Sequence, residues 1–459
     1  MQEKSFLKNA AIIAGGGFIA KILGALYRIP LTNLIGGEGI GLYQLAYPFY
    51  CLLLTVSATG IPSSIAALEA SESAKGEQGK EVFLSAKKLF AVIGGIGTVL
   101  MILFSPFLSF LQGERGLVWG YLCLAPSVFL VSVLSVFRGW FQGKSDMFPT
   151  AVSEVLEQLV KVGIGLGLAY LYRDNVQRAV AAILFAVTLS ELAAFFFMLV
   201  LSKRRGVRKE QRKERLTAKG ILKVSVFVSL SSALLPFSNL IESILTVRLL
   251  SAYAENAVAL YGLFSGGAVT VVGLPVSLCY GVAVASVPRI AKAYEGGERG
   301  RWLRKKIFSC LAVTLAVSLP CALFLYFFAP TVVALVYRSL AGAEKEILIR
   351  LIKNYSISAI TLSLAQTLSA VLTGLKQPKK SFFAFLAGAA VKLFLDILLL
   401  PQPKLSIMGS VIATNVCYFV AFFLCLVYNL GITKTDKEKT QNDYGNRIRG
   451  RKRRFDGAR

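Results

Sequence analysis

Long apolar runs constrain the fold of this chain more than any other feature. Residues 307–329 carry no charge, and residues 185–201 contain only Thr188, Ser190 and Glu191 as polar residues. The hydrocarbon core of a bilayer is about 30 Å thick, so a spanning helix needs about 20 mostly apolar residues. These runs fit that length and exceed an ordinary buried strand. With 55% hydrophobic residues overall, the sequence predicts an all-α polytopic membrane protein.

The pattern predicts about twelve membrane helices in two bundles of six. The expected spans are 10–30, 43–67, 89–111, 117–137, 150–172, 178–201, 221–250, 260–287, 307–329, 354–375, 381–400 and 407–429. The polar break between the sixth and seventh spans contains the run KRRGVRKEQRKER. We therefore expect four parts. These are an N-terminal bundle (1–201), a basic cytoplasmic linker (202–220), a C-terminal bundle (221–429) and a disordered basic cytoplasmic tail (430–459).

The two halves share short stretches in the same order. GLYQLAYPFY (Gly41–Tyr50) is similar to ALYGLFSGG (Ala259–Gly267), and VKVGIGLGL (Val160–Leu168) is similar to VKLFLDILL (Val391–Leu399). Together they suggest an ancient duplication. Since six helices return the chain to the same side, the halves share orientation and their pseudo-two-fold axis lies along the membrane normal. Such a pair encloses a central cavity.

Charge and residue usage exclude several classes of function. The net charge of +26 could indicate nucleic-acid binding, but Lys and Arg concentrate in connectors on one side of the predicted membrane. That asymmetry predicts a multi-pass protein of the cytoplasmic membrane with both termini in the cytoplasm, and no nucleic-acid partner. The chain has no histidine, and its seven cysteines form no CxxC pair. We expect no disulfide framework, no metal site, no cofactor and no enzyme chemistry.

The first span carries the candidate substrate-binding cations. Lys21 and Arg28 share a helix face with Gly17 and Gly24. Glycine beside positive charge would leave room for an anionic ligand. Alternatively, the glycines allow close helix packing, while the cations pair with acids or extend to the interface. In the seventh span Glu242 and Arg248 are six residues apart, so each needs a partner elsewhere. Under the duplication, Arg248 would add a third cation to the cavity.

The remaining ionisable residues within spans are candidates for ion coupling or gating, because charge inside a membrane usually faces protein or water. Glu154, Glu157 and Lys161 lie on the fifth span, and Glu157 and Lys161 are spaced for pairing along the helix. Glu191 stands midway in the sixth span. On the eleventh span Lys392 and Asp396 have the same i, i+4 spacing, so a static pair is again the alternative.

Two stretches resemble a known family. KILGALYRIPLTNLIGGEGIGLYQLAYP (Lys21–Pro48), and FRGWFQG (Phe137–Gly143) followed by PTAVSEVLEQLVKV (Pro149–Val162), are similar to sequences of the stage V sporulation protein B-like and oligosaccharide flippase (polysaccharide biosynthesis) family. That family belongs to the multidrug/oligosaccharidyl-lipid/polysaccharide exporter superfamily, which includes the related lipid II flippases. The resemblance covers essentially the whole membrane part.

This resemblance implies a V-shaped pair of bundles around a central cavity. It also implies a flippase that moves polyprenyl-diphosphate-linked saccharides, such as cell-wall precursors, across the cytoplasmic membrane by alternating access. Related lipid II flippases carry cavity-facing basic residues on the first helix, at places comparable to Lys21 and Arg28. Many of these flippases have fourteen helices, the last two forming a groove for the lipid tail. A chain with twelve puts that groove in doubt.

Two alternatives accompany this prediction. A cation-coupled multidrug-type exporter of the same superfamily would work through Glu154, Glu157, Glu191 or Asp396, driven by a Na⁺ gradient, an H⁺ gradient or the membrane potential. A glycan-lipid enzyme would need clustered carboxylates on a sizeable loop, and the longest outside connector offers only Glu344 and Glu346. We therefore expect a monomeric transporter whose partners are a lipid-linked saccharide and membrane lipids.

Overall fold

The computed structural model describes residues 2–59, 80–204, 236–295 and 301–456, with Pro62, Ile65 and Ala233. Within them every regular element is helical. A helix satisfies its own backbone hydrogen bonds, so apolar segments of this length can cross a bilayer in no other open form. Nine described helices are long and apolar enough to span, with mean hydropathies of 1.3 to 2.3. The predicted linker lies largely outside the described residues.

The first spanning segment contains two of the expected spans. Helix α1 (Gln2–Leu54) is interrupted at Gly36, whose φ of +70° is readily adopted only by glycine. A short π-helix, η1 (Thr55–Thr59), follows. The expected fifth span is helix α5 (Phe148–Leu171). Its three charged residues, Glu154, Glu157 and Lys161, keep it out of the nine apolar segments.

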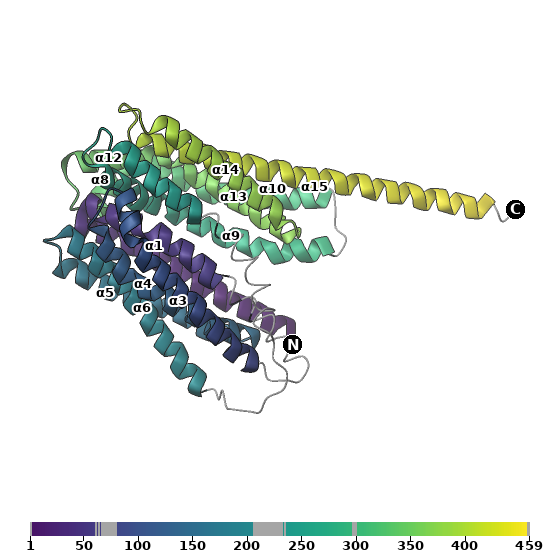
Figure 1. The fold of residues 1–459 in the computed structure, drawn as a ribbon. Coiled ribbons are helices and arrows are strands. Elements are labelled where there is room, and N and C mark those ends of the chain that lie inside the picture. The colour runs from purple at the N-terminus through teal and green to yellow at the C-terminus, as the bar shows by residue number, and fades with distance from the viewer. Residues whose placement is uncertain are drawn as a thin grey trace. The chain divides into compact units, whose positions relative to one another are not determined.

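The structure divides into two compact units. Unit 1 comprises residues 1–270, 331–351 and 396–408, and unit 2 comprises residues 271–330, 352–395 and 409–459. In unit 1, α1 is followed by α3 (Lys80–Leu111), α4 (Leu117–Gly143), α5 and α6 (Val176–Arg204). These helices run side by side in Figure 1, where α4 packs against α3 and α6, and α5 packs against α1 and α6.

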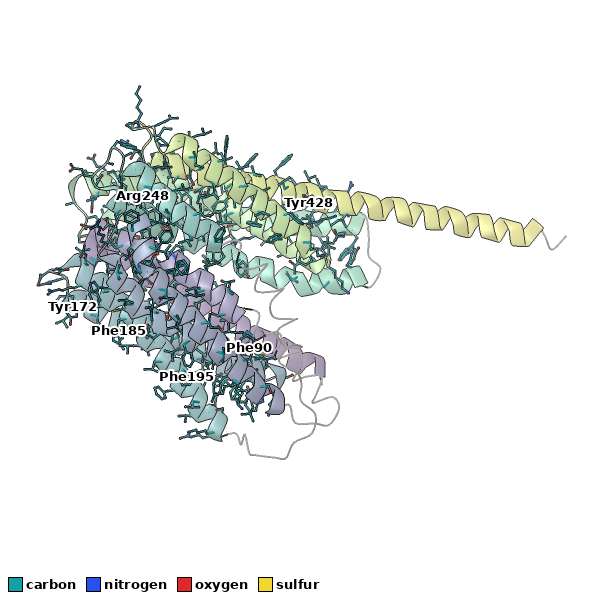
Figure 2. The ribbon with its side chains drawn as sticks, in the orientation of Figure 1. Phe90, Tyr172, Phe185, Phe195, Arg248 and Tyr428 are labelled. Carbon is teal, nitrogen blue, oxygen red and sulfur yellow. The ribbon has the colours of Figure 1, made fainter. Side chains whose placement is uncertain are left out.

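An aromatic core holds α3, α4 and α6 together at one end of unit 1. Phe83 lies between Phe137 and Trp140, with ring centroids 5.1 Å and 5.4 Å away. Phe90 is buried in the same cluster and Phe195 packs against it, as Figure 2 shows. Burying large aromatic side chains stabilises such a core by both apolar area and edge-to-face geometry.

Unit 1 also includes segments from the second half of the chain. These are residues 236–250, α8 (Ala257–Gly262), the π-helix η2 (Leu263–Ala268), α11 (Ala329–Val336) apart from its first two residues, and most of α12 (Gly342–Tyr355). Helix α12 is amphipathic: Leu348, Leu351 and Ile352 are fully buried while Glu346 is exposed. From the sequence we expect this stretch to lie in the longest outside connector.

Paired glycines explain why α8 and η2 join the N-terminal helices. A Cβ on Gly262 would lie 2.2 Å from the Gly37 carbonyl oxygen, and one on Gly41 would lie 2.1 Å from the Val258 carbonyl oxygen. The two backbones are therefore in direct contact, as small-residue spacing permits in membranes. The Gln44 side-chain amide donates to the carbonyl oxygen of Ser265 at 3.0 Å and to its hydroxyl at 2.9 Å. We call this contact the glycine seam.

Unit 2 contains α9 (Val269–Glu295) apart from its first two residues, α10 (Arg301–Phe327), α13 (Ile357–Gly374), nearly all of α14 (Pro378–Leu399) and α15 (Met408–Asp456) apart from its first residue. Its apolar core includes Ile307, Leu368 and Cys425, all fully buried. Polar side chains also join its helices: the hydroxyls of Thr314 and Thr367 are 2.8 Å apart. Helix α15 is helical to Asp456, through much of the stretch expected as a disordered tail.

Candidate functional site

The glycine stripe of the first span faces α5. A Cβ on Gly24 would lie 3.1 Å from Oε1 of Gln158, and one on Gly17 would lie 3.6 Å from Oε2 of Glu154. The two glycines thus bring α1 close to the polar face of α5, which agrees with the close-packing alternative. The backbone of Lys21 belongs to α1, but its side chain lies outside the described part of the structure.

Arg28 is half-buried and lies among phenol and thiol groups. Its guanidinium interacts electrostatically with Tyr43, Tyr47 and Cys51 from the second part of α1. It also interacts with Tyr337, which follows α11; burial raises the pKa of that hydroxyl, and Arg28 opposes the shift. Within the part of the chain that the structure describes, no carboxylate forms an ion pair with Arg28. This leaves its charge available to an anion.

A row of tyrosines lines the neighbouring stretch of α1. The ring centroids of Tyr43 and Tyr47 are 5.2 Å apart, and those of Tyr47 and Tyr50 are 5.6 Å apart. Tyr43 and Tyr50 are buried, whereas Tyr47 is partly exposed beside Arg28. A tyrosine hydroxyl can donate a hydrogen bond while its ring contacts apolar surface. The surroundings of Arg28 therefore suit a ligand that is both anionic and rich in hydroxyl groups.

Glu157 forms an ion pair with a residue of another helix and not with a residue of its own helix. Nη2 of Arg138 on α4 lies 3.1 Å from Oε2 of Glu157 on α5, and Nε of Arg138 donates to the Ser153 hydroxyl at 3.0 Å. The Gln158 side-chain amide donates to Oε1 of Glu157 at 3.0 Å. Both members of the pair are largely buried, with side-chain exposures of 12% and 16%. Arg138 was absent from the predicted site residues.

Lys161 and Glu191 lie beside this pair. Lys161 is 7% exposed and Glu191 is 4% exposed. The Lys161 ammonium interacts electrostatically with the carboxylates of Glu157 and Glu191. It also interacts with the Arg28 guanidinium and the Cys51 thiol. Glu191 interacts electrostatically with Glu157, and its Oε2 is buried without a hydrogen-bond partner. The structure thus brings together four predicted residues: Arg28, Glu157, Lys161 and Glu191.

Arg248 is engaged with the end of another helix. Its Nε and Nη2 donate to the carbonyl oxygens of Leu111 and Phe110, and its guanidinium lies 5.5 Å from the centroid of the Phe110 ring. These carbonyls end α3, where a cation is favoured by the helix dipole. Arg248 is exposed at this position (Figure 2). Its predicted contact with substrate stays a prediction.

Of the other candidates, Glu154 interacts electrostatically with Arg138 beside this group, whereas Glu242, Lys392 and Asp396 lie on other segments. Glu154 is half-buried on α5, and Glu242 is half-buried in residues 236–250. On α14, Asp396 is fully buried and Lys392 is half-buried. All four interact with other groups of the protein. Over the ranges that the structure covers, no group of three His, Cys, Asp or Glu side chains lies where it could hold a metal ion.

Comparison with known proteins places this arrangement in a family. The model of the family described as "Polysaccharide biosynthesis protein" matches residues 6–294. The chain belongs to the polysaccharide biosynthesis protein family. Stage V sporulation protein B of Bacillus subtilis (strain 168) is 27% identical over 428 residues, which cover 90% of this chain and 81% of that protein.

Two solved structures share the fold. An inward-facing multidrug resistance MATE family transporter of the MOP superfamily matches with a TM-score of 0.74 and 17% identity, over 91% of this chain and 95% of that one. Lipid II flippase MurJ in an inward closed conformation matches with a TM-score of 0.72 and 17% identity, over 92% and 90%. The predicted all-α polytopic fold is confirmed, with many helices long and apolar enough to span a membrane.

Proposed function

We propose that this protein is a flippase for polyprenyl-diphosphate-linked saccharides in the cytoplasmic membrane. The observation that carries the proposal is the position of Arg28, half-buried among Tyr43, Tyr47 and Lys161 without a described carboxylate partner. A buried charge without a partner is costly. A diphosphate would neutralise Arg28, and saccharide hydroxyls would find hydrogen-bonding partners in the phenols.

The relatives support this substrate class. One is named Stage V sporulation protein B, and another is Lipid II flippase MurJ of Bacillus subtilis (strain 168), 23% identical over 449 residues. Transport would proceed by alternating access, with both termini in the cytoplasm and the protein acting as a monomer. We also propose that Lys21 and Arg248 contact the substrate during transport.

A cation-coupled multidrug-type exporter is the second candidate. The likeness to a multidrug resistance transporter and the buried carboxylate of Glu191 favour it. Cationic drugs would need negative charge at the site, whereas the groups that interact electrostatically with Arg28 include phenols, a thiol and a second cation. The charge around Arg28 therefore favours an anionic substrate.

Flipping can be measured in proteoliposomes loaded with a fluorescent undecaprenyl-diphosphate-linked saccharide. We expect movement that depends on the protein, and a loss of at least about tenfold in Arg28→Ala. Arg173→Ala serves as the matched control, because Arg173 is exposed and lies over the Tyr170 ring. Export of a cationic dye without movement of the lipid would establish the second candidate instead. Full-rate flipping by Arg28→Ala would refute the proposed site.

A further inference from the structure

Lys161 is a buried cation whose expected partner is engaged elsewhere. The i, i+4 spacing predicts a pair with Glu157, but both oxygens of that carboxylate are used, by Arg138 at 3.1 Å and by Gln158 at 3.0 Å. No described carboxylate lies within ion-pair distance of the Lys161 ammonium. An ammonium that is 7% exposed and lacks a direct counterion is costly inside a membrane protein.

The surroundings of Lys161 are of two opposite kinds. Towards α1 it interacts with Arg28, and the Cys51 thiol interacts with both cations. It also interacts with the carboxylates of Glu157 on α5 and Glu191 on α6. Like charges such as Arg28 and Lys161 repel unless an anion joins them. Lys161 therefore has a second cation on one side and a pair of carboxylates on the other.

The carboxylate pair is arranged to hold a proton. Glu191 interacts electrostatically with Glu157, and one of its oxygens is buried without a hydrogen-bond partner. Two interacting carboxylates can share one proton when their countercharge is withdrawn. The titratable groups around the pair are Arg138 on α4, Lys161 and Glu154 on α5, and Tyr50 on α1.

We propose that the anion and a proton bind to this site together. An anion between Arg28 and Lys161 draws the ammonium away from the carboxylates, which then lose part of their countercharge. The pair takes up one proton from solution, held between Glu157 and Glu191, while Arg138 keeps its place on Glu157. The charge of an incoming diphosphate is thus partly offset by the proton. The identity of the natural anion rests on the proposed function, but the linkage does not.

Calorimetry on the purified full-length protein tests the linkage. Farnesyl diphosphate is titrated at pH 8 in Hepes and in Tris, buffers whose ionisation enthalpies differ, so the difference in heat gives the protons taken up. We expect an uptake of about one proton per bound anion, as expected for a single shared site. The same titration is repeated with inorganic pyrophosphate. Proton uptake with both ligands means that the diphosphate group suffices. Proton uptake with farnesyl diphosphate alone means that the farnesyl group also contributes. Either result supports the inference.

Three variants assign the roles. Glu191→Gln should bind farnesyl diphosphate within about threefold of the natural affinity but take up no proton. Arg28→Ala should lose at least about tenfold in affinity. Glu346→Gln, an exposed glutamate on α12, should match the unmodified protein in both respects. Unchanged proton uptake in Glu191→Gln would overturn the assignment of the proton to this pair.

Cys51 gives a readout that does not depend on the Glu191 variant folding. In a protein whose other six cysteines are replaced by serine or alanine, 2-sulfonatoethyl methanethiosulfonate should modify Cys51, and farnesyl diphosphate should slow this at least about fivefold. Binding and protection without proton uptake would overturn the linkage and leave the proposed function standing. Absence of both binding and protection would overturn the anion site, and with it the basis of the proposed function.

Discussion

At the scale of single residues, the ion pair between Arg138 on α4 and Glu157 on α5 holds two largely buried charges. Glu157 and Lys161 share a helix face, which made a pair along the helix one of two readings. The structure assigns Glu157 to Arg138, 19 residues earlier. Arg138 was counted as a connector residue because the apolar run ends at Phe137, whereas α4 continues to Gly143. Spacing within one helix cannot reveal a partner on another.

Breaking the Arg138–Glu157 pair from one side should destabilise the protein strongly. Arg138→Met leaves a buried carboxylate without its cation, and such a change costs about 3–5 kcal/mol. We expect a clearly lower melting temperature in detergent, measured by intrinsic fluorescence. The double variant Arg138→Met/Glu157→Gln removes both charges and should recover part of the loss. If the double variant melts no higher than Arg138→Met, the pair is not the source of the effect.

The carboxyl group of Glu114, in the loop between α3 and α4, should penalise the folded state at neutral pH. Partial burial raises its pKa, and the nearby Glu38 raises it further. Below the ordinary carboxyl pKa the group is protonated whether the chain is folded or not, so Glu114→Gln should melt like the unmodified protein. As the pH rises through that value and then through the raised pKa, ionisation destabilises the fold.

Glu114→Gln should therefore melt higher than the unmodified protein at pH 8 and equally at about pH 4. Melting curves across this range measure the difference. Glu346→Gln is the control, since Glu346 is exposed on α12. A stabilisation that is the same at both pH values would show that ionisation of Glu114 is not its cause.

At the scale of elements, hydropathy predicted the spanning helices well and their interruptions poorly. The runs near residues 89–111, 117–137 and 407–429 correspond to α3, α4 and the first part of α15. A hydropathy window cannot show the break at Gly36 or the π-helices η1 and η2, because they depend on backbone dihedrals and on neighbouring helices. The sequence contains the glycines of the glycine seam, but it does not show which backbone atoms of other segments they contact.

The glycine seam should tolerate no side chain at Gly262. A Cβ there would lie 2.7 Å from the Gly41 Cα as well as 2.2 Å from the Gly37 carbonyl oxygen, so Gly262→Ala must push the helices apart. Overpacking of this kind costs about 1–3 kcal/mol. In a cysteine-free background with Gln44→Cys and Ser265→Cys, we expect Gly262→Ala to lower the disulfide yield at least about fivefold.

Gly167→Ala is the matched control for the seam. Gly167 lies on α5 with nothing within 4 Å of the added Cβ, so alanine should leave the yield unchanged and favour the helix by about 0.5–1 kcal/mol. An equal loss of disulfide in both variants would mean that the effect is a general one of alanine substitution. An unchanged yield in Gly262→Ala would show that the helices do not need this close approach.

At the scale of the whole molecule, charge asymmetry predicts which connectors face the cytoplasm. Ser145 lies in the connector between α4 and α5, and Lys404 lies in the connector between α14 and α15; both are exposed. The positive-inside rule places Ser145 inside and Lys404 outside. In intact cells, a membrane-impermeant maleimide should label Lys404→Cys and reach Ser145→Cys only after permeabilisation. An odd number of helices separates the two connectors, so labelling of both positions from outside would contradict the twelve-helix layout. Labelling of Ser145→Cys alone from outside would show that the protein has the opposite orientation in the membrane.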